Sequence, residues 1–123
     1  MRDVWAEIES DETGNPLHVG VDPDGTPVLL SRAVWQEHIL VHHPEMREFR
    51  HLILQAITSP VEREVENDEG KFIRTYAELP IERQPSRSRL RVRVVIKYVQ
   101  PPEREGRRTG LVSSAYLVRW TTR

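Results

Sequence analysis

The 123-residue chain contains no cysteine, which excludes disulfides and thiolate chemistry. No apolar run comes near the roughly 20 residues that a membrane-spanning helix needs. The N-terminal residues 1–7 lack the apolar core of a secretory signal peptide. These absences predict a cytoplasmic protein without a membrane partner. The length suits one domain with its own core, so we expect a single domain over residues 1–123, with residues 1–16 as a flexible or peripheral segment.

The formal net charge is only −1, but the charges are unevenly distributed along the chain. Residues 1–70 hold 15 acidic and 5 basic residues, whereas residues 71–123 hold 4 acidic and 13 basic residues. Such asymmetry indicates a polyanion partner for the basic half. The alternative is that two oppositely charged halves pack together and solvate each other. Composition leaves both interpretations open.

Turn and capping signals predict how the N-terminal half begins. The sequence Asp22-Pro23-Asp24-Gly25 is a strong turn signal between the apolar runs 17–21 and 27–30, which predicts a small hairpin. Ser31 follows, and its hydroxyl can accept a hydrogen bond from a free N–H group of a helix over about residues 32–42.

A second helix and a run of strands are expected after this first helix. Pro44 ends the first helix and begins the second, over residues 45–58, where apolar residues repeat at helical spacing. From residue 60 the period changes to two. Strands are expected over residues 61–66, 71–79, 90–99 and 111–120, joined by a turn at 67–70 and loops at 80–88 and 100–108. The predicted fold is therefore α+β: two helices followed by a four-stranded antiparallel β-meander, with a small N-terminal hairpin.

The histidines are concentrated at the end of the first predicted helix. Trp35, His38, Ile39 and His42 are spaced so that they share one face of an α-helix. With a pKa near 6.5, imidazole is the one side chain that exchanges protons at neutral pH without a shift of its pKa by the protein. His38 and His42 also have a spacing that metal ligands use. No third candidate ligand stands at a sequence spacing typical of a metal site, so we predict no metal and no cofactor. A structural role under the sheet is the other alternative.

The predicted strands carry positive charge and hydroxyl groups on one face of the sheet. Strand alternation places Arg91, Arg93 and Lys97 together on one strand, with Arg74 and Tyr76 together on another. In the last strand the residues expected to share a face are Val112, Ser114, Tyr116, Val118 and Trp120. Histidines that face such a sheet suit acid–base chemistry on a phosphodiester, whereas the simpler interpretation is that the arginines are solvated and block edge-to-edge aggregation.

Several short stretches resemble the barnase–EndoU–colicin–RelE superfamily of metal-independent ribonucleases, and especially its small phage- and toxin-associated branch. They span about residues 27–120. The stretches are Trp35-Gln36-Glu37-His38-Ile39, His43-Pro44-Glu45, Ile57-Thr58-Ser59-Pro60, Arg74-Thr75-Tyr76, Leu90–Lys97 and Val112-Ser113-Ser114-Ala115-Tyr116. The resemblance implies two helices followed by a four-stranded sheet, the order expected above from the residues.

The resemblance also implies an activity and its residues. The helix histidine of the family falls on His38, the histidine before proline on His43, and the positive strand residue on Arg74 or Lys97. Its last-strand hydroxyl, usually a threonine, falls on Ser114, and its aromatic residue on Tyr116. The acidic strand 61–66 departs from the pattern and weakens a nearby RNA-binding surface.

The expected activity is cleavage of RNA, chiefly single-stranded, to a 2′,3′-cyclic phosphate by acid–base catalysis. The expected nucleic-acid-binding residues are Tyr76, Arg91 and Arg93. A cognate inhibitor or antitoxin protein is an expected partner. The alternative is a module without catalytic activity that binds nucleic acid or a protein through the basic sheet face.

Overall fold

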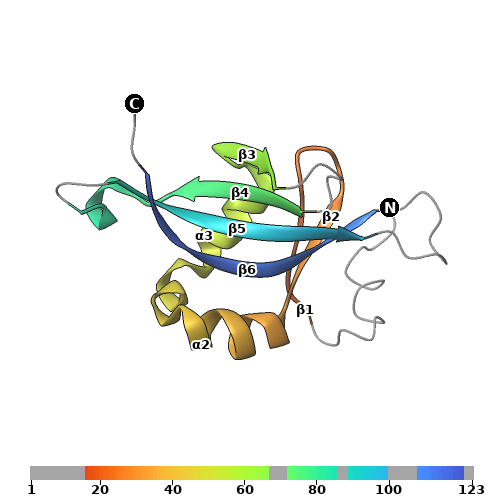
Figure 1. Cartoon of the computed structure of the whole chain (residues 1–123), viewed down its shortest axis with the longest axis horizontal. Coiled ribbons are helices and arrows are strands. Elements are labelled where there is room, and N and C mark those ends of the chain that lie inside the picture. The colour runs from red at the N-terminus through yellow and green to blue at the C-terminus, as the bar shows by residue number, and fades with distance from the viewer. Residues whose placement is uncertain (1–15, 67–71, 86–88, 100–107, 121–123) are drawn as a thin grey trace.

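The computed structural model describes residues 16–66, 72–85, 89–99 and 108–120 (Figure 1). Residues 1–15 of the expected N-terminal segment, the turn at 67–70 and most of the loop at 100–108 lie outside these residues. The strands are β1 Pro16–Val21, β2 Pro27–Ser31, β3 Glu62–Val65, β4 Phe72–Glu78, β5 Arg89–Val99 and β6 Thr109–Trp120. The helical segments are the π-helix η1 Val34–Ile39, α2 Leu40–His42, the 3₁₀ helix η2 Pro44–Phe49, α3 Arg50–Thr58 and the 3₁₀ turn η3 Ile81–Arg83.

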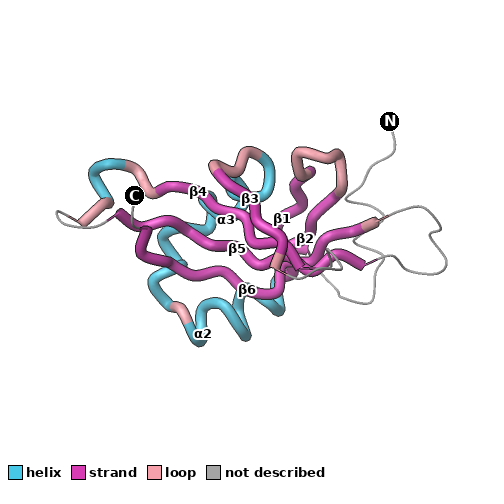
Figure 2. Tube along the Cα trace, turned by 45° about the horizontal axis from the view of Figure 1, so that its top comes forward, coloured by secondary structure: helices cyan, strands magenta, loops and turns pink. Residues whose placement is uncertain are grey.

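All of these strands join one six-stranded sheet in the order β1-β2-β6-β5-β4-β3 (Figure 2). Strands β3 to β6 are antiparallel neighbours. The N-terminal hairpin joins them because β2 pairs in parallel with the start of β6. The α+β class is as expected, but the prediction of a four-stranded meander was wrong, since the hairpin extends the same sheet.

The composition of β2 explains why the hairpin belongs to the sheet. Val28, Leu29 and Leu30 are consecutive and all buried, as is typical of strands that are covered on both faces. Their pairing partner on β6 begins with Gly110. A Cβ atom at Gly110 would lie 2.9 Å from side-chain atoms of Val28 and Ile96. The missing side chain therefore lets β2 approach β6 closely.

The hydrophobic core lies between α3 and one face of the sheet, where α3 runs behind β4 and β5 (Figure 1). The buried residues of α3 are Leu52, Ile53, Ala56 and Ile57. On β5 the inward residues are Val92, Val94 and Ile96, which alternate with less buried residues. Because side chains alternate along a strand, the residues between them point to the opposite face. That face carries the polar residues described below.

The first helix forms where the sequence predicts it, and the Ser31 hydroxyl accepts a hydrogen bond from the Val34 amide at 3.1 Å. Its middle, however, is the π-helix η1. Trp35 and Ile39 are buried, whereas His38 and His42 are exposed. The prediction that these four residues share one face was wrong, because the wider turn of a π-helix changes which residues align. π-Helical turns are rare and occur frequently at functional sites.

A β-bulge corrects a second expectation about shared faces. Val95 of β5 pairs with Ser114 and Ile96 pairs with Val112, so Ser113 is an extra residue on β6. Val112 is consequently buried in the core, while Ser114 is only partly buried. The prediction that Val112 shares a face with Ser114 and Tyr116 was wrong.

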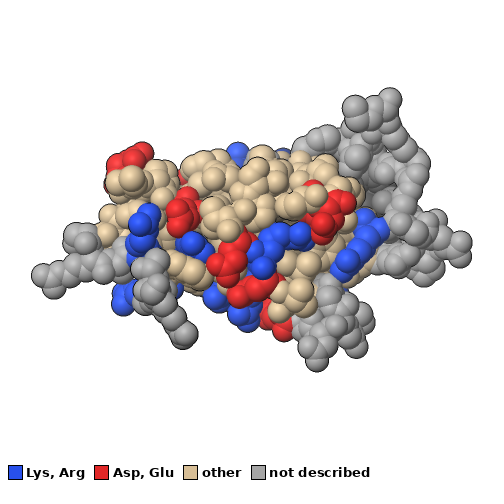
Figure 3. Space-filling view, turned by 90° about the horizontal axis from the view of Figure 1, so that it is seen from above, with Lys and Arg blue, Asp and Glu red and all other residues tan. Residues whose placement is uncertain are grey.

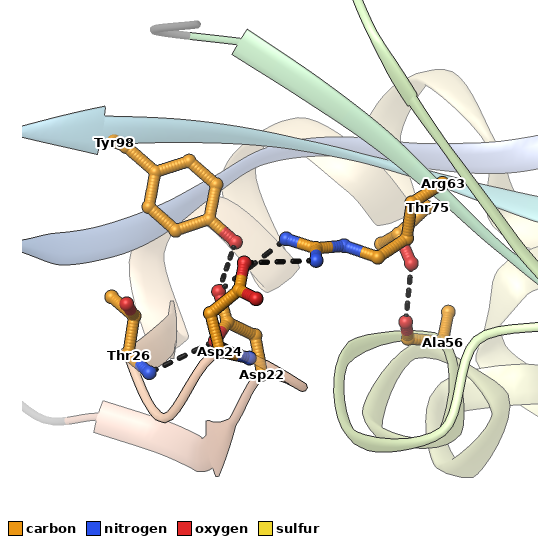
Figure 4. A network of polar contacts seen from close by, with 7 residues as sticks. All are labelled: Asp22, Asp24, Thr26, Ala56, Arg63, Thr75 and Tyr98. Carbon is orange, nitrogen blue, oxygen red and sulfur yellow. Dashed lines mark hydrogen bonds and ion pairs between the residues drawn. The ribbon is translucent and has the colours of Figure 1, made fainter.

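A buried polar network fastens the hairpin turn to the sheet (Figure 4). The turn includes Gly25, whose φ of 85° favours glycine. Asp22 is 5% exposed and accepts hydrogen bonds from the amides of Asp24 and Thr26, both at 2.9 Å. Its other carboxylate oxygen accepts from the Tyr98 hydroxyl at 2.8 Å and lies 3.6 Å from Arg63. Burial and the hydrogen bond to Asp22 raise the pKa of Tyr98.

Candidate active site

A row of polar side chains crosses the sheet on the face opposite α3. The strand register places Tyr76 of β4 beside Arg93 of β5, and Arg93 beside Tyr116 of β6. The Arg93 Nε donates a hydrogen bond to the Tyr76 hydroxyl at 3.0 Å, and its Nη1 donates to the Tyr116 hydroxyl at 3.4 Å. The guanidinium therefore lies between two phenols, at the centre of the row.

Arg93 differs from its neighbours in having no carboxylate within ion-pair distance among the residues that the structure describes. Burial lowers the pKa of Arg93, but the hydrogen bonds to Tyr116 and Tyr76 outweigh this effect and raise it above its ordinary value. Arg93 therefore stays charged, and no acid in the described part of the chain lies close enough to form an ion pair with it. Such a cation attracts an external anion more strongly than a paired arginine does.

His43 joins the row from the helical layer. It lies between α2 and η2, with φ −138° and ψ 68°, a non-helical conformation that agrees with the restriction imposed by Pro44. Its ring stacks on Tyr116, with 5.1 Å between the ring centroids. About one third of its side chain is exposed, and its Nδ1 lies 3.7 Å from Glu45. An accessible imidazole thus stands at the β6 end of the row.

Glu64 of β3 occupies the other end of the row, where its carboxylate accepts a hydrogen bond from the Tyr76 hydroxyl. Burial, followed by this hydrogen bond, raises the pKa of Tyr76, although Arg93 acts in the opposite direction. The sequence interpretation missed Glu64 and treated strand 61–66 only as a departure from an RNA-binding pattern. The available signal was the alternation of Glu62, Glu64 and Glu66, which places all three carboxylates on the side of the strand that faces the arginines.

The arginines on either side of the row are paired with acids. Arg74 lies 3.3 Å from Glu66 and 3.8 Å from Glu64. Arg91 lies 3.2 Å from Glu62 and 3.3 Å from Glu78, and its guanidinium carbon is 3.7 Å from the centre of the Trp120 ring. Among the coloured residues in Figure 3, basic and acidic side chains accordingly alternate over the surface in view. The expected basic face is therefore locally neutralised around Arg93.

The remaining predicted residues lie away from the centre. His38 contacts His42 edge-on, with 5.0 Å between the ring centroids, and both are exposed. Lys97 pairs with Phe72 in register, and its ammonium lies 6.0 Å from that ring. Ser114 pairs with Val95, two residues from Tyr116 along β6. The structure thus brings together His43, Arg93, Tyr76 and Tyr116, but not His38 or Lys97.

The described part of the chain contains no group of three or more His, Cys, Asp or Glu residues that could hold a metal ion. Within the same residues, none of the helices is long and apolar enough to cross a membrane. Comparisons of the chain with protein-family models, with curated proteins and with solved structures find no match. The geometry of the row is therefore what remains to indicate a function.

Proposed function

We propose that the chain is a metal-independent endoribonuclease domain that cleaves single-stranded RNA to a 2′,3′-cyclic phosphate. The observation that carries the proposal is the row itself: an imidazole and a carboxylate stand at its two ends, and an arginine without an acidic partner among the described residues stands at its centre. RNA transesterification needs one group to accept a proton, another to donate one, and a cation for the charge that develops between them.

The chemistry assigns a role to each group. Glu64 takes the proton from the ribose 2′-hydroxyl, and that oxygen attacks the adjacent phosphorus. Arg93 stabilises the charge on the phosphoryl oxygens as the P–O5′ bond breaks. His43 gives a proton to the leaving 5′-oxygen. Tyr76 and Tyr116 position the guanidinium between them.

The resemblance to the barnase–EndoU–colicin–RelE superfamily supports the same activity, with two changes of assignment. His43 replaces His38 as the leading acid–base histidine, because His38 is exposed and its one ring contact within the described residues is with His42. Arg93 replaces Arg74 and Lys97 as the phosphate-binding group at the centre of the row. Arg74 is paired with acids, and Lys97 lies farther along β5, beyond Val95, where it pairs with Phe72. We expect an inhibitor protein, where one exists, to cover this row.

The test is cleavage of single-stranded RNA by the purified protein in EDTA, with the products analysed for a 2′,3′-cyclic phosphate. His43→Ala and Glu64→Gln should each lower the rate by about 10²-fold or more, the range of general acid–base catalysis. His42→Ala is the matched control, because it removes the neighbouring exposed imidazole and should leave the rate unchanged. RNA with a 2′-deoxy sugar at the cleaved position should resist cleavage, since the nucleophile is missing.

Three results would decide against the proposal. Cleavage at the wild-type rate by a folded His43→Ala variant would remove the acid–base assignment. RNA binding without cleavage under any condition would favour the alternative, a binding module that uses the same face. Loss of activity in EDTA would instead point to a metal at His38 and His42.

A further inference from the structure

Arg74 pairs with Glu66 at the end of strand β3. This contact leads to an inference that rests on the proposed function and extends it. We propose that Arg74 is a second phosphate-binding position for single-stranded RNA, beside Arg93, and that the carboxylate of Glu66 occupies it until RNA binds. Glu66 thus acts as an internal substitute for a phosphate and restrains binding at the site. Three features support this role: the position of Arg74, the strength of its ion pairs and the place of β3 in the sheet.

Arg74 lies one step along the sheet from the centre of the row. It belongs to β4 two residues before Tyr76, so their side chains point to the same face about 7 Å apart along the strand. Its side chain is 34% exposed, which leaves it accessible to a ligand. A strand of RNA whose scissile phosphate contacts Arg93 can therefore bring the next phosphate to Arg74.

The ion pairs of Arg74 are loose. Charge-assisted pairs are typically about 2.7–2.9 Å long, whereas Glu66 and Glu64 lie 3.3 Å and 3.8 Å from Arg74. Its Nε is buried and has no hydrogen-bond partner among the described residues, which is equally true of the Arg91 Nε. Partly exposed pairs of this kind contribute about 0.2–1 kcal/mol and are weakened by salt. A phosphate, which presents more acceptor oxygens than one carboxylate edge, can replace Glu66 at little cost.

The place of β3 makes such a replacement feasible without unfolding the sheet. β3 is the last strand in the order, and among the described strands its one partner is β4. Glu66 directly follows it, and its amide still donates to the carbonyl of Phe72. The side chain of Glu66 can therefore turn away while its backbone stays paired.

Arg91 provides the contrast. Its side chain is only 12% exposed, it is paired with Glu62 and Glu78, and it stacks on Trp120. Three partners from three strands hold it in place. Arg91 is accordingly a structural residue, and the proposed phosphate positions are Arg93 and Arg74 alone.

The test measures binding separately from cleavage. Fluorescence anisotropy with a labelled oligonucleotide that carries a 2′-deoxy sugar at the cleaved position gives Kd as a function of salt concentration. Glu66→Gln keeps the size of the side chain but removes its charge. It should lower Kd by about two- to fivefold, the factor that corresponds to a surface ion pair, and steepen the salt slope by about 0.7, the value for one additional phosphate of a single strand.

Two controls separate this effect from a general change in charge. Glu48→Gln removes the same charge from the pair of Glu48 with Arg83, 2.7 Å apart and outside the sheet face, and should leave the salt slope unchanged. In an Arg74→Gln background, Glu66→Gln should no longer tighten binding. A dinucleotide with a single phosphate should not distinguish Glu66→Gln from the wild type, whereas a trinucleotide with two phosphates should.

Each outcome has a defined meaning. The inference would be overturned by an equal gain in RNA affinity from Glu48→Gln and Glu66→Gln, or by a gain in affinity that persists without Arg74. Either result would leave the proposed ribonuclease intact. The expected gain without any cleavage of ordinary RNA would support the second phosphate position and overturn the ribonuclease. Failure of every variant to bind RNA at low salt would overturn both.

Discussion

Arg93 shows how far single residues of the site can be predicted from sequence. Strand alternation placed Arg93 and Tyr76 among the nucleic-acid-binding residues, and Tyr116 followed from the resemblance; the structure brings the three together. What alternation cannot show is which arginine lacks an acidic partner, because that depends on pairing with β3 across β4. Glu64 was missed for the same reason, since its contact with Tyr76 joins two separate strands.

Replacing Arg93 by lysine tests whether cleavage depends on the arrangement of the guanidinium N–H donors as well as on the positive charge. A lysine ammonium is a single point of charge and cannot donate to both phenols in the geometry that Arg93 uses. We expect Arg93→Lys to lower the cleavage rate by about 10²-fold, the effect of losing one fixed donor to a developing oxyanion. Urea unfolding should show a change in the free energy of unfolding of about 1 kcal/mol or less. A rate close to that of the wild type would mean that charge alone is sufficient.

At the scale of elements, local patterns predicted most positions, and the errors came from non-local pairing in the sheet and from the local geometry of the first helix. The β-branched, period-two run of 90–99 became β5, and the Ser31 cap formed as expected. The attachment of β2 to β6 was missed because it joins segments about 80 residues apart, although the uninterrupted apolar run 28–30 was its signal. The π-helix was missed because a spacing of three and four residues is normally interpreted as an α-helix.

The close approach of β2 to β6 predicts the effect of adding one methyl group. Gly110→Ala places a Cβ atom 2.9 Å from Ile96 and Val28 and 3.0 Å from Tyr98. Because these side chains are packed on several sides, the strands must separate slightly, which should cost about 1–3 kcal/mol of unfolding free energy. Thermal unfolding gives the size of the effect, and hydrogen exchange should show faster exchange in β2 than in β4. Equal protection of the two strands would contradict this account.

At the scale of the whole molecule, the two oppositely charged parts of the chain meet on the sheet. Glu62, Glu64 and Glu66 come from the acidic part, and Arg74 and Arg91 from the basic part. The ion pairs agree with the interpretation in which the two oppositely charged parts pack together, and a polyanion partner stays a prediction. Complementary pairs neutralise most of this face, and among the described residues Arg93, at its centre, has no carboxylate within ion-pair distance. Net charge alone could not have shown this arrangement.

The network that joins the hairpin to the rest of the sheet predicts how stability depends on pH. Burial and the hydrogen bond to Asp22 raise the pKa of Tyr98 in the folded state. Below about pH 10, the ordinary pKa of tyrosine, the phenol is neutral in both folded and unfolded chains, and the contribution of Tyr98 to stability is complete. Above that pH the unfolded chain loses the proton first, which favours unfolding, so this contribution declines as the pH rises through the folded-state pKa.

Tyr98→Phe isolates this contribution from that of the other titrating groups. At pH 7 the variant leaves the buried Asp22 carboxylate without its hydroxyl donor, which should cost about 1–3 kcal/mol of unfolding free energy. As the pH rises from 9 to 11, the wild type should lose stability faster than the variant, because only the wild type carries the shifted phenol. Raised pKa values shared by both proteins, such as that of Tyr76, cancel in the comparison. Urea unfolding of both proteins across this range should therefore show the difference becoming smaller, and a constant difference would mean that the hydrogen bond to Asp22 does not hold the phenol in its neutral form.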